Sequence, residues 1–123
     1  MADPALFSAL KNLPKAKAEV WFKKDDGEAF FFASTIVSEL RASGWDVGQP
    51  IETSAHPWPG NQGVPIIGVY IIAKAFNVDD LFNSQSRLFI LSAAVHSSSG
   101  VVDATLPEDV FRIVIGQLVN LIW

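Results

Sequence analysis

The feature that most constrains the fold is an uncharged run, V-P-I-I-G-V-Y-I-I-A, from Val64 to Ala73. Its apolar residues do not alternate with polar ones, so a strand formed here would be buried on both faces. Such strands are typical of sheets that helices cover on both sides. We therefore expect Ile66–Ala73 to be extended at the centre of a sheet, with one amphipathic helix above it and one below.

Segments on either side of this run would supply those two helices. The first, from Gly27 to Ser43, carries one apolar stripe, and Gly44 follows where a left-handed C-cap is expected. The second begins after Asn77, a good N-cap, and its apolar side continues to Val95. A shorter amphipathic helix is expected at Pro4–Leu13, where the following proline ends it.

The remaining strands are short. We expect them at Ala18–Phe22, Trp45–Val47, Val101–Val102 and Val110–Ile115. Strand, helix and strand follow one another in each half of the chain, and such βαβ units have parallel strands. The predicted fold class is α/β: a small βαβ-based sandwich with a mostly parallel sheet of about four or five strands, two main helices and a short N-terminal helix.

A chain of 123 residues has room for one hydrophobic core. We expect a single α/β domain over residues 1–123, with an N-terminal helix and lead-in at 1–17, a core at 18–117 and an apolar tail at 118–123. No stretch is both regular and apolar over the about 20 residues that a membrane helix needs. We therefore expect a soluble, cytoplasmic chain that does not itself insert into a membrane.

The charge balance excludes several classes of partner. Nine Lys and Arg residues against thirteen Asp and Glu residues give a net charge of −4. A nucleic-acid binder needs a basic surface to neutralise phosphates, and so does a protein that adheres to anionic lipid. The chain has no cysteine, which rules out disulfides, thiolate nucleophiles and Cys-ligated zinc. We predict no nucleic-acid partner and no cofactor.

Asp25 and Asp26 follow the first strand, where open α/β sheets commonly place ligands. Two carboxylates there could hold Mg²⁺ as in receiver domains, but a receiver also needs an acceptor Asp after the central strand. Here that strand ends in A-K-A around Lys74. Helix capping is the simpler interpretation, with Asp25 and Glu28 forming a capping-box pair. No metal site is predicted, and a ligand cleft near Asp25, Asp26 and Lys74 stays open as an alternative.

Other catalytic patterns are lacking. The loop K-K-D-D-G-E has one glycine and three acids, which does not suit phosphate binding. His56 and His96 lie in separate segments without the spacing of a helical zinc site. The serines after His96 do not form G-x-S-x-G. We predict no catalytic residue.

Two apolar features indicate contact with a partner. Trp58 lies between two prolines in H-P-W-P-G, so its indole either forms the lip of a cleft, anchors a partner or folds back onto the sheet. We count it with His56 among the contact candidates. The tail Q-L-V-N-L-I-W is predicted to mediate self-association into a homo-oligomer. Its apolar residues are Leu118, Val119, Leu121, Ile122 and Trp123.

Several segments together resemble a soluble domain of uncharacterised bacterial proteins. They are A-E-V-W-F-K, E-A-F-F-F-A-S-T-I-V-S-E-L-R-A-S-G-W-D-V, G-V-Y-I-I and L-P-E-D-V-F-R-I-V-I-G, spread over roughly residues 6–117, and the most specific pieces are A-S-G-W-D-V and R-I-V-I-G. In those proteins the domain typically follows one or two N-terminal membrane helices. The resemblance implies a natural parent that is membrane-tethered with this portion in the cytoplasm. It carries no activity or catalytic residue to transfer.

Two functions remain open. The first is a non-enzymatic binding, sensory or interaction module that associates with itself. The second is a small-ligand or nucleotide-responsive, enzyme-like domain that uses a cleft near Asp25, Asp26 and Lys74. A thermal-shift screen separates them, because a ligand at a hundredfold its Kd adds about 2.7 kcal/mol of stability.

Overall fold

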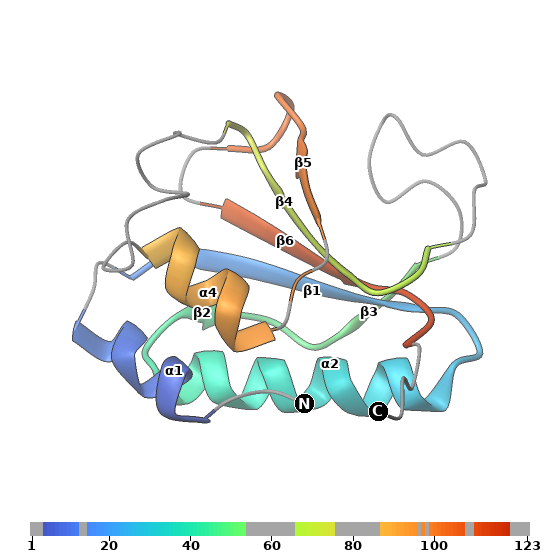
Figure 1. Cartoon of the computed structure of the whole chain (residues 1–123), viewed down its shortest axis with the longest axis horizontal. Helices are drawn as coiled ribbons and strands as arrows, with labels where there is room; N and C mark the ends of the chain where they lie inside the picture. The colour runs from blue at the N-terminus through green and yellow to red at the C-terminus, as the bar shows by residue number, and fades with distance from the viewer. Residues whose placement is uncertain are drawn as a thin grey trace.

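The structure is a computed structural model that describes residues 4–12, 15–53, 66–75, 87–95, 97, 99–107 and 110–118 (Figure 1). Its helical elements are α1 (Pro4–Ala9), the short 3₁₀ helix η1 (Leu10–Asn12), α2 (Gly27–Ala42) and α4 (Arg87–Val95). Its strands are β1 (Lys17–Lys23), β2 (Asp46–Val47), β3 (Ile51–Thr53), β4 (Val69–Ala73), β5 (Ser99–Val102) and β6 (Val110–Ile115). These elements confirm an α/β fold.

The six described strands form one mixed sheet in the order β2-β1-β6-β4-β5, and β3 extends the β2 edge by pairing with the other half of β1. β1 is parallel to β2, β3 and β6, and β4 is parallel to β5. Only the contact between β4 and β6 is antiparallel. The expected mostly parallel sheet is therefore correct, whereas the number of strands and the antiparallel pair were not predicted.

Each half of the chain forms a βαβ unit. β1, α2 and β2 make the first, with neighbouring parallel strands; β4, α4 and β5 make the second. The two units run in opposite directions, because β6 is parallel to β1 and antiparallel to β4. β6 joins them into one sheet.

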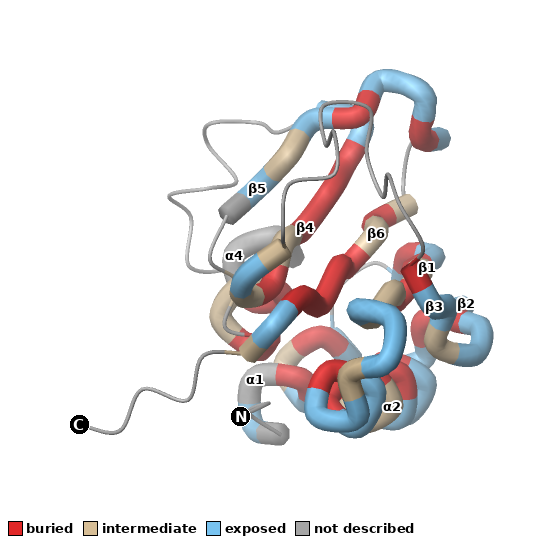
Figure 2. Tube along the Cα trace, turned by 90° about the vertical axis from the view of Figure 1, so that its right-hand side faces the viewer, coloured by how far each residue is buried: buried red, intermediate tan, exposed pale blue. Residues whose placement is uncertain are grey.

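Strand alternation gives the sheet two different faces. One face packs on the helices: Ala18, Ile71 and Ile113 share a buried cluster with Phe32 and Ile36 of α2. Further members come from α1, η1 and α4 (Phe7, Leu10, Leu91 and Val95). Figure 2 shows this burial along the strands and on the inner side of α2. The described helices therefore form one layer and the sheet the other.

The second face has its own small cluster, to which no described helix contributes. Ile72, Leu106 and Val114 are buried there, and Trp21 and Tyr70 pack against them. We expected a helix on each side of β4. That expectation is wrong for the described helices, because side chains of the sheet itself and of the turn after β5 cover this face.

The apolar run is also shorter and less central as a strand than predicted. β4 begins at Val69, because Gly68 has a φ of +86° and interrupts the extended backbone before it. β4 lies between β6 and β5, so β6 and not β4 occupies the centre. Ile71, Ile72 and Ala73 are nevertheless buried, which confirms the predicted burial on both faces.

The helix bounds predicted from the sequence agree with the structure in the described residues. The prediction for Gly27–Ser43 matches α2 to within a residue, and Gly44 adopts a φ of +89° after the helix. The apolar side predicted to continue to Val95 agrees with α4, which ends at that residue. Residues 76–86, where that helix was expected to begin, lie outside the described residues.

A close backbone approach at the end of β6 requires glycine. A Cβ added at Gly116 would lie 2.2 Å from the carbonyl oxygen of Ile66 and 2.4 Å from its carbonyl carbon. The approach is fixed by hydrogen bonds from Gly116 N to Gly68 O at 2.9 Å and from Gln117 N to Ile66 O at 2.8 Å. The segment before β4 is therefore attached to the end of β6 by backbone contacts that leave no room for a side chain.

We predict that Gly116→Ala lowers the free energy of unfolding by at least about 2 kcal/mol, because backbone must move to admit the methyl group. Urea titration followed by circular dichroism measures the loss. Gly48→Ala is the matched control, since Gly48 is exposed and an added Cβ there has no neighbour within 4 Å. A cost at Gly116 no larger than at Gly48 would contradict the prediction.

Candidate functional site

The acidic loop after β1 serves the start of α2. Asp26 is the N-cap residue, and its Oδ1 accepts a hydrogen bond of 3.0 Å from the backbone N–H of Ala29. Asp25 is exposed and has a φ of +59°, in the left-handed region. The interpretation as a helix cap is therefore confirmed, but the capping side chain is Asp26 and not Asp25.

Substitutions of the two aspartates in this loop should differ sharply in their effect on stability. Asp26→Ala is expected to cost about 1 kcal/mol of stability, because it removes the acceptor that satisfies a backbone N–H of the first turn. Asp25→Gly should be neutral or stabilising, because glycine adopts a positive φ without a steric penalty. Thermal or urea unfolding of the two variants against wild type measures both effects. Equal losses at the two positions would show that Asp26 does not act alone as the cap.

The structure does not bring Lys74 to the acidic loop. β1 ends beside Ile115 of β6, and β4 begins beside the same residue. Because β4 is antiparallel to β1, Lys74 follows β4 at the opposite end of the sheet from Asp25 and Asp26 (Figure 1). The three residues thus cannot line one cleft.

The other predicted contact residues are mostly outside the described part of the chain. His56 and Trp58 lie in residues 54–65, and Val119, Leu121, Ile122 and Trp123 follow the last described residue. Leu118 is described: it is half-buried and packs against the helix-side core. Leu118 therefore lies on the helix side of the sheet.

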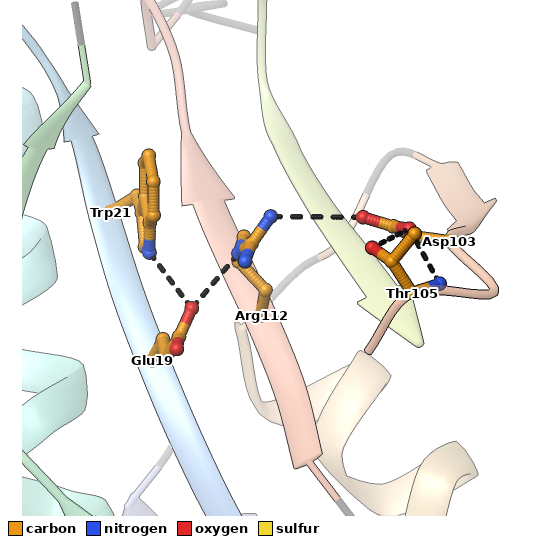
Figure 3. A network of polar contacts seen from close by, with 5 residues as sticks. All are labelled: Glu19, Trp21, Asp103, Thr105 and Arg112. Atoms are coloured by element: carbon orange, nitrogen blue, oxygen red, sulfur yellow. Dashed lines mark hydrogen bonds and ion pairs between the residues drawn. The ribbon is translucent and has the colours of Figure 1, made fainter. Parts of the chain in front are cut away.

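A polar network on the sheet face opposite the described helices joins three parts of the fold (Figure 3). Arg112 of β6 donates from Nε to Glu19 Oε1 of β1 at 2.9 Å, and its guanidinium carbon lies 4.7 Å from the centre of the Trp21 ring. The Trp21 indole N–H donates to the same Glu19 oxygen at 3.2 Å. On the other side, Arg112 lies 3.8 Å from Asp103 Oδ2.

Asp103 fixes the turn after β5. It is only 4% exposed, and its Oδ1 accepts hydrogen bonds from the backbone N–H and the hydroxyl of Thr105 at 3.0 and 2.6 Å. The bond from the Thr105 hydroxyl lowers the pKa of Asp103 most; burial opposes this, while the Thr105 N–H and the charge of Arg112 lower it further. The net pKa lies below the ordinary value of 3.8, so Asp103 is ionised at neutral pH.

The network has the chemistry of a clamp. Both carboxylates accept bonds from donors within the fold, and the guanidinium is shared between them. The network therefore ties β1, β6 and the turn after β5 together.

This network was not predicted, although the sequence contains a signal for part of it. Glu19 and Arg112 are each the only charged residue inside an apolar strand segment, in A-E-V-W-F and F-R-I-V-I. Opposite charges at the middle of two strands are typical of a cross-strand pair. Asp103 gave no such signal, because an aspartate after a strand is common in turns.

We predict that Asp103→Asn destabilises the protein at neutral pH and that its deficit against wild type narrows in acid. A carboxyl with a lowered folded-state pKa stabilises the fold fully above its unfolded pKa of about 4, and loses that contribution as the pH falls through the folded value. Urea unfolding of both proteins across this range measures the deficit. Asp46→Asn, at an exposed carboxylate, corrects for the lost charge. A deficit that stays constant with pH would contradict the prediction.

A second surface feature lies where β1 meets α2. Phe30 and Phe31 in the first turns of α2 are 49% and 66% exposed. The Phe30 ring packs edge-on against Phe22 of β1, with ring centres 5.1 Å apart. We call Phe22, Phe30 and Phe31 the aromatic patch. Single exposed apolar residues are ordinary, but two consecutive exposed Phe residues in one helix are typical of a contact surface.

Neither a metal centre nor a membrane helix is found among the described residues. No three of their potential metal-ligating side chains gather in one place. None of the described helices has the length and hydropathy that a bilayer crossing requires. Comparison with models of protein families, with curated proteins and with solved structures found no match to this chain.

Proposed function

We propose that this chain is a non-enzymatic interaction module that associates with a second copy of itself. The observation that carries the proposal is the aromatic patch, whose two outer rings remain largely exposed on a helix that is otherwise packed on the sheet. An enzyme-like alternative at Asp25, Asp26 and Lys74 has no single cleft to use, because the sheet separates these residues.

The occupant we assign to the patch is the part of the second copy's apolar tail that follows Leu118, residues 119–123. Phe22 of the patch is aligned with Ile115, three residues before Leu118, so Leu118 follows β6 at the same end of the sheet as the patch. Five residues follow Leu118, four of them apolar, and extended they reach about 17 Å. Two copies that exchange tails would form a symmetric dimer in which each patch is covered once.

The energetics favour a dimer of modest affinity. Full burial of a Phe side chain contributes roughly 1.5–3 kcal/mol, and these rings are already partly covered. Association costs an estimated 4–15 kcal/mol before any net affinity remains. The free energy from burying four half-exposed rings and two short tails exceeds only the lower part of this range. The dimer should therefore dissociate on dilution.

The resemblance to a bacterial membrane-tethered domain enters this proposal as a second step, supported by the sequence likeness alone. A tether in the parent protein would hold several copies at the cytoplasmic face of a membrane. Confinement raises their effective concentration and strengthens a weak contact without new interactions. A dimer of modest affinity is the kind that such confinement would regulate.

The oligomeric state tests the proposal. We expect wild-type chain to show concentration-dependent association by sedimentation velocity, and the Phe30→Ser/Phe31→Ser double variant to have a lower weight-average sedimentation coefficient at the same concentrations. Truncation after Leu118 should have the same effect while keeping the packing of Leu118 on the core. Ser38→Ala, at an exposed polar position further along α2, is the matched control and should dimerise like wild type.

Two results would overturn the proposal. One is a wild-type chain that stays monomeric up to its solubility limit. The other is an unchanged dimer in both the double variant and the truncated chain, with circular dichroism showing all proteins folded. A thermal shift with a nucleotide or divalent ion would instead favour the enzyme-like alternative.

A further inference from the structure

The β5 edge of the sheet lacks the features that protect the opposite edge from pairing with other chains. Exposed edge strands offer backbone N–H and C=O groups to other chains, and proteins usually protect them with charges, proline or bulges. The edge formed by β2 and β3 has Asp46 and Glu52, both exposed, with Pro50 between the strands. β5, with the sequence S-G-V-V, has none of these protections.

β5 is also open in the described part of the structure. It pairs with β4 on one side, with Ser99–Val102 opposite Tyr70–Ala73, and it ends the order of described strands. Val102 is 57% exposed, an unusual amount for an apolar residue in a sheet strand. In a chain of net charge −4, an uncharged edge is also a place where two copies meet without direct repulsion.

We propose that β5 pairs with β5 of a second copy, antiparallel, about a twofold axis at Val101. In an antiparallel pair, the side chains of opposed residues lie on the same face of the sheet. A strand that pairs with its own copy must therefore have the twofold axis at a residue and not between two residues. Centred on Val101, the register places Val102 opposite Gly100 of the second copy. The exposed Val102 side chain then lies opposite a glycine, which has no side chain, and the two copies of Val101 are opposite each other.

This register agrees with the two faces of the sheet. Gly100 and Val102 are aligned with Ile71 and Ala73, which face the helices, whereas Val101 is aligned with Ile72 and packs in the cluster on the other face. The pairing would cover Val102 and continue one sheet through both copies. It is separate from the aromatic patch, so a chain that uses both contacts can assemble beyond a dimer.

Cysteine cross-linking tests the register directly, because the natural chain has no cysteine. Opposed residues have Cα atoms about 4.5–5.5 Å apart, within the range of about 4.4–6.8 Å that a disulfide spans. Val101→Cys should therefore form a disulfide-linked dimer under mild oxidation. Val102→Cys is the matched control: in this register the two copies of position 102 lie about 8 Å apart and should not cross-link.

The outcomes separate this proposal from the one on the aromatic patch. We expect cross-linking of Val101→Cys to persist when Phe30→Ser/Phe31→Ser is added, since that change removes only the other contact. Equal cross-linking at positions 101 and 102, or none at 101 while the reduced variant melts like wild type, would overturn the pairing. In the second case the edge would remain open to an extended peptide from a different protein, detectable by mass spectrometry of material co-purified with the chain.

Discussion

The pairing of β6 with both β1 and β4 is the constraint on which the rest of the structure depends. Without β6, the first βαβ unit and the second would be two separate pieces, each too small to enclose a core. With it, the helix-side residues of three strands form one continuous surface under α1, α2 and α4. The polar network adds a side-chain link at the same place, since Arg112 reaches both Glu19 and the turn of Asp103.

This constraint is non-local, which explains how much of the fold the sequence predicted. The elements themselves follow from local patterns: α2 from its apolar stripe and caps, and β1 and β6 from runs of β-branched and aromatic residues. The bonded pair Glu19 and Arg112 is 93 residues apart in the chain. Which strands meet, and in which direction, is decided by such contacts, and no local pattern contains them.

The expectation of helices on both faces is wrong for the described helices, and for a related physical reason. An apolar strand needs both faces covered, and sequence patterns do not say by what. In this fold Trp21, Tyr70 and Leu106 pack with Val114 and Ile72. Bulky side chains of the sheet and of one turn therefore cover the face where a helix was expected. The predicted cleft failed with it, because a cleft shared by Asp25 and Lys74 required β1 and β4 to run in the same direction.

The two motifs on which the family resemblance rests also have structural explanations. In A-S-G-W-D-V, the Ser43 hydroxyl donates to Phe7 O at 2.9 Å, Gly44 adopts a positive φ, and Trp45 packs on Phe111 with ring centres 5.9 Å apart. In R-I-V-I-G, Arg112 forms the polar network and Gly116 permits the close approach of Ile66.

These residues hold α1 to α2 and β6 to its neighbours. A protein that has both motifs is therefore expected to share the architecture, but not necessarily the binding surfaces. The surfaces proposed to bind lie elsewhere, at Phe30 and Phe31 and at the edge formed by β5. They are exposed, and their replacement costs the core little. Proteins with the same motifs could therefore keep this fold and differ in whether, and with what, they associate. For that reason the motifs support an inference about architecture, while the binding proposals depend on the exposed residues of this particular chain.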